Sequence, residues 1–136
     1  MAFDGITVSA LVAEIDDNLK GGRINKIAQP ENDELLITEK GANGQKRLLL
    51  SASASLPLIY FTDKNRISPL TAPNFCMLLR KHIGSARILD VKQPGMERVV
   101  EFELEHLNEL GDPCRKRLIM ELMGKHSNII FCDEKA

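Results

Sequence analysis

The chain has 136 residues, a formal net charge of −1, 43% hydrophobic residues and 27% charged residues. These values are typical of one folded globular domain, and they exclude a strongly basic protein that coats nucleic acid by charge alone. No stretch is as long and apolar as a bilayer span, and the first residues lack the basic and apolar regions of a secretion signal. We therefore expect a cytoplasmic protein that does not contact membranes.

The first half of the chain predicts one helix followed by four strands. Apolar residues from Val8 to Leu19 recur at three- and four-residue spacing, which predicts a helix over residues 7–19 that ends at Gly21 and Gly22. Strands are expected over residues 23–29, 34–39, 46–52 and 58–62. The connectors between them are short and turn-like, which favours antiparallel pairing.

The second half predicts the same order of elements. A helix is expected over residues 73–83, with Pro73 in its first turn, Thr71 as its cap and Gly84 at its end. Strands are expected over residues 87–93, 98–106, 115–123 and 128–132.

The two halves also share a sequence pattern. The segment from Arg23 to Pro30 recurs from Arg87 to Pro94, an offset of 87 − 23 = 64 residues. Self-similarity of this kind indicates one supersecondary unit used twice. The predicted fold class is therefore α+β: two pseudo-repeated units of one helix and four strands, over about residues 5–64 and 69–133, packed as an antiparallel β-sandwich or flattened barrel with two helices.

Catalytic and metal-binding motifs are absent from the sequence. The three histidines are scattered, the three cysteines form no close pair, and no phosphate-binding loop or nucleophile motif occurs. We predict no catalytic residue, no metal and no cofactor, and we expect Cys76 and Cys132 to be buried free thiols. The alternating carboxylates Glu101, Glu103 and Glu105 favour a solvated sheet face over acid–base chemistry.

The turn that carries Glu97 and Arg98 is the first candidate binding site. An adjacent carboxylate and guanidinium at a hairpin tip can present acceptors and a planar donor fork to one target, and such forks suit phosphates and guanine edges. The corresponding turn of the first half has Asp33 and Glu34, so it lacks the basic partner. An exposed turn with a weak ion pair is an equally good interpretation from the residues alone.

Further basic residues gather in the second half. Arg80, Lys81 and His82 end the second helix, where cations also complement the helix dipole, and Lys125 and His126 lie in a tight polar connection that suits a phosphate or a simple turn. One face of an otherwise neutral domain is thus predicted to suit RNA. The candidate contacts are Glu97, Arg98, Arg80, Lys81, Lys125 and His126, followed by Asp4 and Glu121.

Several long strings of the sequence resemble the amino-terminal domain of the NFACT family. These are residues 3–5, 21–24, 48–52, 74–83 and 121–130, and the resemblance covers essentially the whole chain, which we interpret as one NFACT-N domain over residues 1–136. The family signature for tRNA binding is an Asp-Arg dipeptide, which falls on Glu97 and Arg98. The carboxylate is here one methylene longer.

The resemblance implies a role in ribosome quality control. Members of the family bind large ribosomal subunits that are obstructed by peptidyl-tRNA, recruit tRNA (alanyl-tRNA in bacteria), and promote template-independent tailing of the stalled chain. Because the ribosome performs peptide transfer, the resemblance implies a recruiting protein and not an enzyme, with no small-molecule substrate.

Two other classes of function stay open at this point. One is a surface adhesin that binds fibronectin, which is an older description of the family. The other is a nucleic-acid-binding domain like the amino-terminal domain of formamidopyrimidine-type DNA glycosylases, whose fold the family resembles. Those enzymes use an amino-terminal proline as their nucleophile, and this chain has Ala2 and Phe3 instead, so glycosylase catalysis is not expected.

Overall fold

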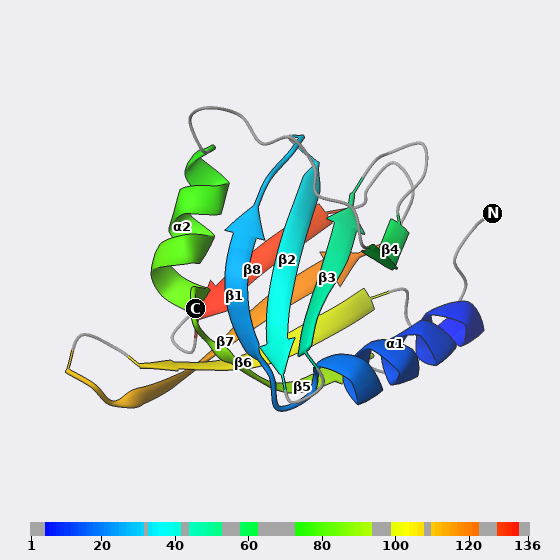
Figure 1. Cartoon of the computed structure of the whole chain (residues 1–136). Helices are drawn as coiled ribbons and strands as arrows, with labels where there is room; N and C mark the ends of the chain where they lie inside the picture. Colours follow the sequence, from blue (N-terminus) through cyan, green and yellow to red (C-terminus); the bar gives the residue numbers. More distant parts are fainter. Residues whose placement is uncertain are drawn as a thin grey trace.

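A computed structural model describes residues 5–31, 33–41, 44–52, 58–62, 73–93, 99–107, 110–122 and 128–133. Within these ranges the chain forms two helices and eight strands, all paired antiparallel, so the α+β class is confirmed (Figure 1). The elements in chain order are α1 (Gly5–Leu19), β1 (Arg23–Ala28), β2 (Glu34–Gly41), β3 (Gly44–Ser51), β4 (Leu58–Thr62), α2 (Asn74–Ile83), β5 (Arg87–Lys92), β6 (Val99–Leu107), β7 (Pro113–Glu121) and β8 (Asn128–Asp133).

The strands form one continuous sheet in the order β4-β3-β2-β1-β5-β6-β7-β8. The sequence left a β-sandwich or a flattened barrel open; the four strands of each half do not form a separate sheet, because Arg23 of β1 pairs with Arg87 of β5 and joins the halves. We call this junction of β1 and β5 the seam. It has one register pair, so the sheet can bend there and the two halves can face each other. Figure 1 shows β1–β3 standing in front of β7 and β8, which cross behind them.

One apolar core lies between the halves. Val12, Ile15 and Leu19 of α1 are buried at the spacing that the sequence predicted. Cys76, Leu79 and Ile83 of α2 are buried in the same core. The strands contribute Ile24, Ile27, Leu35, Ile37, Leu48, Leu50, Ile59, Ile88, Val91, Val100, Phe102, Leu104, Leu118 and Met120.

Both helices end at glycine, for different backbone reasons. Gly21 has a φ of 86°, a left-handed conformation that residues with a side chain rarely adopt, and it follows α1 directly. Gly84 follows α2 with an extended backbone, and its amide donates to the carbonyl oxygen of Arg80. The N-cap position of α2 is held by Pro73 without a side-chain hydrogen bond, so Pro73 precedes the first turn and does not lie in it; Thr71, the expected cap, lies outside the described residues.

The two halves have the same element order and the same irregularity. The register of β1 against β2 shifts between Ile24 and Lys26, and that of β5 against β6 shifts between Ile88 and Asp90. These positions differ by 88 − 24 = 64 and 90 − 26 = 64 residues, which is the offset of the sequence pattern.

Candidate nucleic-acid interface

The Glu97–Arg98 corner lies in the connection between β5 and β6. Residues 94–98 are outside the described part of the chain, but the strands on both sides are described. These strands are adjacent and antiparallel, and Lys92 near the end of β5 pairs with Glu101 near the start of β6. The predicted pairing of the two flanking strands is confirmed, and Glu97 and Arg98 belong to the short segment of the chain between them.

A second connection with candidate residues leaves the sheet at the same edge. Val99, the first residue of β6, pairs with Glu121, the last residue of β7, and Glu121 pairs with Asn128, the first residue of β8. The β7–β8 connection, which contains Lys125 and His126, thus begins and ends beside the β5–β6 connection. Lys125 and His126 themselves lie outside the described residues, whereas Glu121 is described and half-buried.

Helix α1 points its first turn towards this edge. The amide of Gly21 donates to the carbonyl oxygen of Ile88, and the amide of Val91 donates to Oδ1 of Asp16. The helix therefore runs antiparallel to β5, and Figure 1 shows its first turn on the side of the molecule where β6 begins. Asp4, which directly precedes the helix, lies outside the described residues.

Arg80 and Lys81 lie at the opposite end of these strands. Helix α2 leads directly into β5 at Arg87, and Arg87 pairs with Glu105 of β6. Glu105 is six residues from Val99, a rise of about 20 Å along a strand. The structure thus separates Arg80 and Lys81 from the edge that carries the other candidates.

Two of the basic residues at the end of α2 have structural partners. Nε of Arg80 donates a 2.8 Å hydrogen bond to the carbonyl oxygen of Ile27 in β1, which holds the helix against the sheet. Nζ of Lys116 in β7 donates to the carbonyl oxygen of His82 at 3.1 Å, and the His82 ring lies 5.5 Å from that of Phe131. These contacts favour the helix-end interpretation for Arg80 and His82, while Lys81 is exposed.

The alternating carboxylates of β6 form an ion-pair ladder. Glu101 lies near Arg117 (3.2 Å) and Lys92 (3.6 Å), and Glu103 lies near Arg115 (3.2 Å) and Lys92 (3.4 Å). Glu103, followed by Glu101, raises the pKa of Lys92. A fully solvated face was expected, but Glu101 is only 8% exposed because these cations cover it. Acid–base chemistry is not needed to explain this row.

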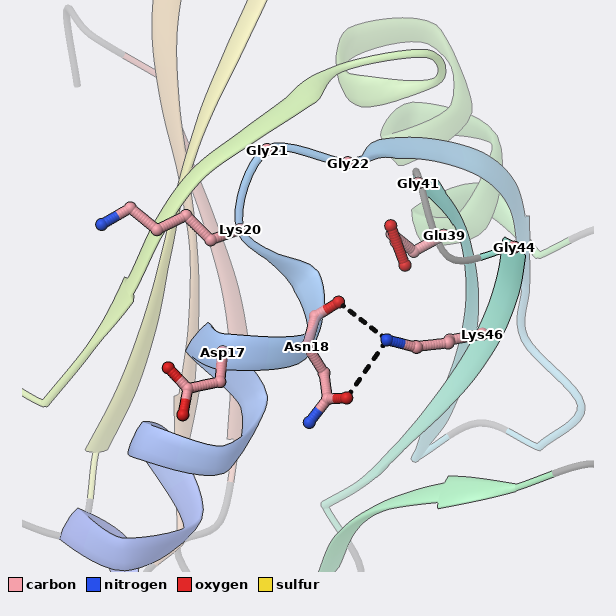
Figure 2. A pocket seen from close by; sticks show the side chains of 9 residues that line it. All are labelled: Asp17, Asn18, Lys20, Gly21, Gly22, Glu39, Gly41, Gly44 and Lys46. Carbon is pink, nitrogen blue, oxygen red and sulfur yellow. Dashed lines mark hydrogen bonds between the residues drawn. The ribbon is translucent and has the colours of Figure 1, made fainter.

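A polar pocket of about 290 Å³ lies between the end of α1 and the β2–β3 hairpin (Figure 2). Its lining consists of charged and amide side chains and four glycines: Asp17, Asn18, Lys20, Gly21, Gly22, Glu39, Gly41, Gly44 and Lys46. Figure 2 shows Nζ of Lys46 between two oxygens of Asn18, and these hydrogen bonds measure 3.3 Å to the carbonyl and 3.1 Å to Oδ1. Lys46 therefore ties β3 to the last turn of α1.

Glu39 is the unusual residue of this pocket. It is 3% exposed, and its Oε2 has no hydrogen-bond partner among the described residues. Burial raises the pKa of the Glu39 carboxyl, and the positive charge of Lys46 opposes that rise. Glu39 is not among the residues predicted from the sequence, and Gly22 and Gly41, which lie against its carboxylate, are the signal that could have indicated it.

The three cysteines are free, and Cys76 is buried as expected. Cys132 is only half-buried, because β8 forms an edge of the sheet. Among the described residues no group of three or more His, Cys, Asp or Glu side chains is arranged to hold a metal ion. Neither helix in the described part of the chain is long and apolar enough to cross a membrane.

Comparison with known proteins gives consistent matches over the whole chain. Residues 4–136 match the family of NFACT N-terminal and middle domains. The chain is 38% identical over 133 residues to the Rqc2 homolog RqcH of Bacillus subtilis, which covers 98% of this chain and 23% of that protein. It is 29% identical over 131 residues to the ribosome quality control complex subunit NEMF of Homo sapiens, covering 96% of this chain and 11% of that protein.

Solved structures agree with these sequence matches. The N-terminal domain of the fibronectin-binding protein PavA from Streptococcus pneumoniae superposes with a TM-score of 0.93 at 38% identity, over 98% of this chain and 50% of that one. The fibrinogen binding protein from Staphylococcus aureus superposes with a TM-score of 0.88 at 34% identity, over 98% and 47%. The chain thus spans about a quarter of the length of its bacterial curated relatives and half of these solved chains. On the match over residues 4–136 and these identities, the chain belongs to the NFACT family and corresponds to its N-terminal part.

Proposed function

We propose that this chain is the tRNA-binding domain of a ribosome quality-control factor, and that Glu97 and Arg98 are its central tRNA contacts. The observation that carries this proposal is family membership together with the position of the Glu97–Arg98 connection. Its relatives include the Rqc2 homolog RqcH and the ribosome quality control subunit NEMF. The connection joins two adjacent antiparallel strands whose register is fixed by the ladder from β5 to β8.

The chemistry of the corner suits an RNA target. A guanidinium offers a planar fork of N–H donors to a phosphate or a guanine edge, and a carboxylate accepts from the amino groups of cytosine or adenine. Lys125 and His126 belong to the neighbouring β7–β8 connection, where a cation adds a contact to the sugar-phosphate backbone. We assign the anticodon arm as the part of the tRNA that meets this edge.

In the full-length protein, this domain would act together with other parts of the chain. We propose that the factor binds obstructed large ribosomal subunits in the cytoplasm and recruits alanyl-tRNA for template-independent tailing of the nascent chain. The ribosome performs peptide transfer, so the domain needs no catalytic residue of its own. The longer carboxylate at Glu97, compared with the aspartate of the family signature, shifts the reach of the acid by one methylene and thereby affects which tRNA is preferred.

We also propose that the two halves are copies of one structural unit and that the fold is related to the amino-terminal domain of formamidopyrimidine-type DNA glycosylases. The shared element order and the shared position of the register shift support the first of these statements. Glycosylase chemistry would require an amine nucleophile that Ala2 does not provide. Borohydride trapping on damaged DNA should therefore give no covalent adduct.

The test is to recover RNA with the full-length protein from cells and to sequence it. The wild-type protein should enrich tRNA, with alanine tRNA foremost, and Glu97→Ala/Arg98→Ala should lose it. The matched control is Glu105→Ala/Arg115→Ala, which removes an opposite cross-strand pair of the same charges at the other end of β6. Equal tRNA recovery by the wild type and the Glu97/Arg98 variant would refute the assignment.

A second candidate function follows from the names of the solved relatives. PavA is described as a fibronectin-binding protein, and the Staphylococcus aureus relative as a fibrinogen binding protein. If this chain were an adhesin, it would bind immobilised fibronectin saturably, and surface labelling of intact cells would reach it. We expect neither result, because both the RqcH and the NEMF relatives bear names that refer to ribosome quality control or its factor Rqc2.

A further inference from the structure

Three cations stand directly opposite one another where the two halves of the sheet meet. Arg23 of β1 is the register partner of Lys40 on β2 and of Arg87 on β5. Register partners on neighbouring antiparallel strands point to the same face of the sheet, with Cβ atoms about 5 Å apart. All three residues are exposed. We call Lys40, Arg23 and Arg87 the cation row.

The backbone under the cation row is held firmly. The amide of Ile24 donates to the carbonyl oxygen of Ala86 at 2.8 Å, and the amide of Ile88 donates to the carbonyl oxygen of Gly22 at 2.8 Å. The amide of Ser85 donates to the carbonyl oxygen of Ile24 at 3.0 Å. Because these bonds flank Arg23 and Arg87 on both sides, the two arginines project from fixed positions of the seam.

The fold gives these charges little compensation. Like charges directly opposite each other destabilise a sheet. Arg23 donates from Nη1 to the carbonyl oxygen of Ser85 at 3.4 Å, which is a neutral acceptor. Among the described residues, the side chains of Lys40 and Arg87 have no hydrogen bond or ion pair. Glu105 follows Arg87 across the sheet, but no ion pair joins them, and the next residue of the series is again a cation, Arg115.

The cations beside β6 differ from the cation row because each of them has a carboxylate partner. There, Lys92, Arg115 and Arg117 each lie within 4 Å of a carboxylate. The net charge of the chain is −1, so an uncompensated group of three cations is a local concentration of positive charge. A group of exposed cations that no carboxylate neutralises creates a positive potential that attracts anions.

We propose that the cation row binds the phosphodiester backbone of an RNA strand. The row offers two guanidinium forks and one ammonium group on strands about 4.8 Å apart. Their N–H groups donate charge-assisted hydrogen bonds, and phosphate oxygens accept such bonds. Contacts of this kind carry no sequence information, so the row would position an RNA that another surface reads. This inference rests on the proposed RNA-binding function, but it concerns a different surface from the Glu97–Arg98 corner, at the far end of β5.

The test measures how salt affects binding of a single-stranded RNA without tRNA structure. A fluorescent 20-nucleotide polyuridylate is titrated with the chain at several KCl concentrations, and the logarithm of the binding constant is plotted against that of the salt concentration. Each phosphate contact to a single strand contributes about 0.7 to the slope. The variant Arg23→Gln/Lys40→Gln/Arg87→Gln should therefore lose about 2 in slope and bind at least about tenfold more weakly at low salt, by the same counterion argument.

Matched variants make the result decisive. Arg115→Gln also removes one exposed arginine, but one that Glu103 neutralises, so its slope should stay at the wild-type value. Each single change in the row should lower the slope by about 0.7, and the triple variant should melt no lower than the wild type because like charges have been removed. The proposal would be overturned if the triple variant kept the wild-type slope. It would also be overturned if Arg115→Gln lowered the slope as much as a single change in the row does.

Failure of this inference can be told apart from failure of the proposed function. Glu97→Ala/Arg98→Ala should remove the preference for tRNA. Replacing the three cations of the row in that same background should still lower the polyuridylate slope by about 2. If the corner variant loses tRNA and the row variants bind polyuridylate like the wild type, the tRNA function stands and the cation row is refuted. If polyuridylate binding depends on the row and tRNA recovery does not depend on Glu97 and Arg98, the cation row stands and the proposed tRNA contact is refuted.

Discussion

The carboxylate of Glu39 fills the space that a side chain on Gly22 would need. A Cβ atom placed on Gly22 would overlap Oε1 of Glu39, and one placed on Gly41 would overlap the same atom. At both positions a side chain would meet Glu39 through close approach and not through an unusual backbone conformation, and the overlap is larger at Gly22, where Cδ and Cγ of Glu39 are also too close. The relationship couples the end of α1 to β2 through one buried acid.

Gly22→Ala should destabilise the fold because the added methyl group would overlap Glu39 and force it and its packed neighbours to shift. We expect a loss of about 1–3 kcal/mol in the free energy of unfolding, measured by urea denaturation. In a Glu39→Ala background, the same change should cost clearly less, because the overlapping carboxylate is gone. Equal costs in the two backgrounds would show that the residues are not coupled.

The raised pKa of Glu39 predicts a pH dependence of stability. A carboxyl whose pKa is higher in the folded state than its ordinary value of 4.5 binds more protons when folded, over the range between the two values. Stability should therefore fall as the pH rises from about 4.5 through the folded pKa. Glu39→Gln should remove this decline and raise the melting temperature at neutral pH. The control Glu31→Gln, at an exposed acid, should keep the wild-type profile, and a wild-type profile in Glu39→Gln would contradict the prediction.

Arg80 is expected to contribute to stability as well as to charge. Arg80→Ala removes the hydrogen bond to the carbonyl oxygen of Ile27 and should cost about 1–2 kcal/mol of unfolding free energy. Lys81→Ala, at the exposed neighbouring position, should change it by less than about 0.5 kcal/mol. Thermal melts of both variants check this. Equal melting temperatures would mean that Arg80 has no structural role, and its place as an RNA contact would then gain weight.

Two neighbouring leucines test how α2 is docked. Leu79 is fully buried, so Leu79→Ala should cost about 2–5 kcal/mol. Leu78 is 42% exposed, so Leu78→Ala should cost less than about 1 kcal/mol. Chemical denaturation of the two variants measures the difference, and a reversed order would mean that the helix presents another face to the core.

The helices and strands could be predicted from local patterns. The spacing of Val12, Ile15 and Leu19 fixed the buried face of α1, and alternation and turns identified all eight strands, with ends that differ by up to two residues. The start of β4 at Leu58 was predicted correctly, whereas β3 begins at Gly44 and not at residue 46. Hairpin ends depend on how long the ladder continues, which local composition specifies weakly.

The joining of the halves could not be predicted from local patterns. It depends on the pairing of Arg23 with Arg87, two residues 64 positions apart that carry the same charge, and no pairing rule favours such a contact. The burial of Glu39 was missed for a related reason, because a Thr-Glu-Lys string in a strand normally indicates a solvated end. Strand pairing brings the β5–β6 and β7–β8 connections to the same edge of the sheet. It also places Arg80 and Lys81 at the other end of these strands, and neither result could be predicted from distances along the sequence.

The most direct test of the account is the dissociation constant of alanine tRNA for the full-length protein and for Arg98→Ala, measured at one fixed salt concentration. We predict a loss of about 1–3 kcal/mol, or roughly 5- to 150-fold, because a guanidinium fork is removed from a specific contact, while Arg115→Ala keeps the wild-type value. If Arg98→Ala binds alanine tRNA as tightly as the wild type, the corner does not bind tRNA and the account is wrong.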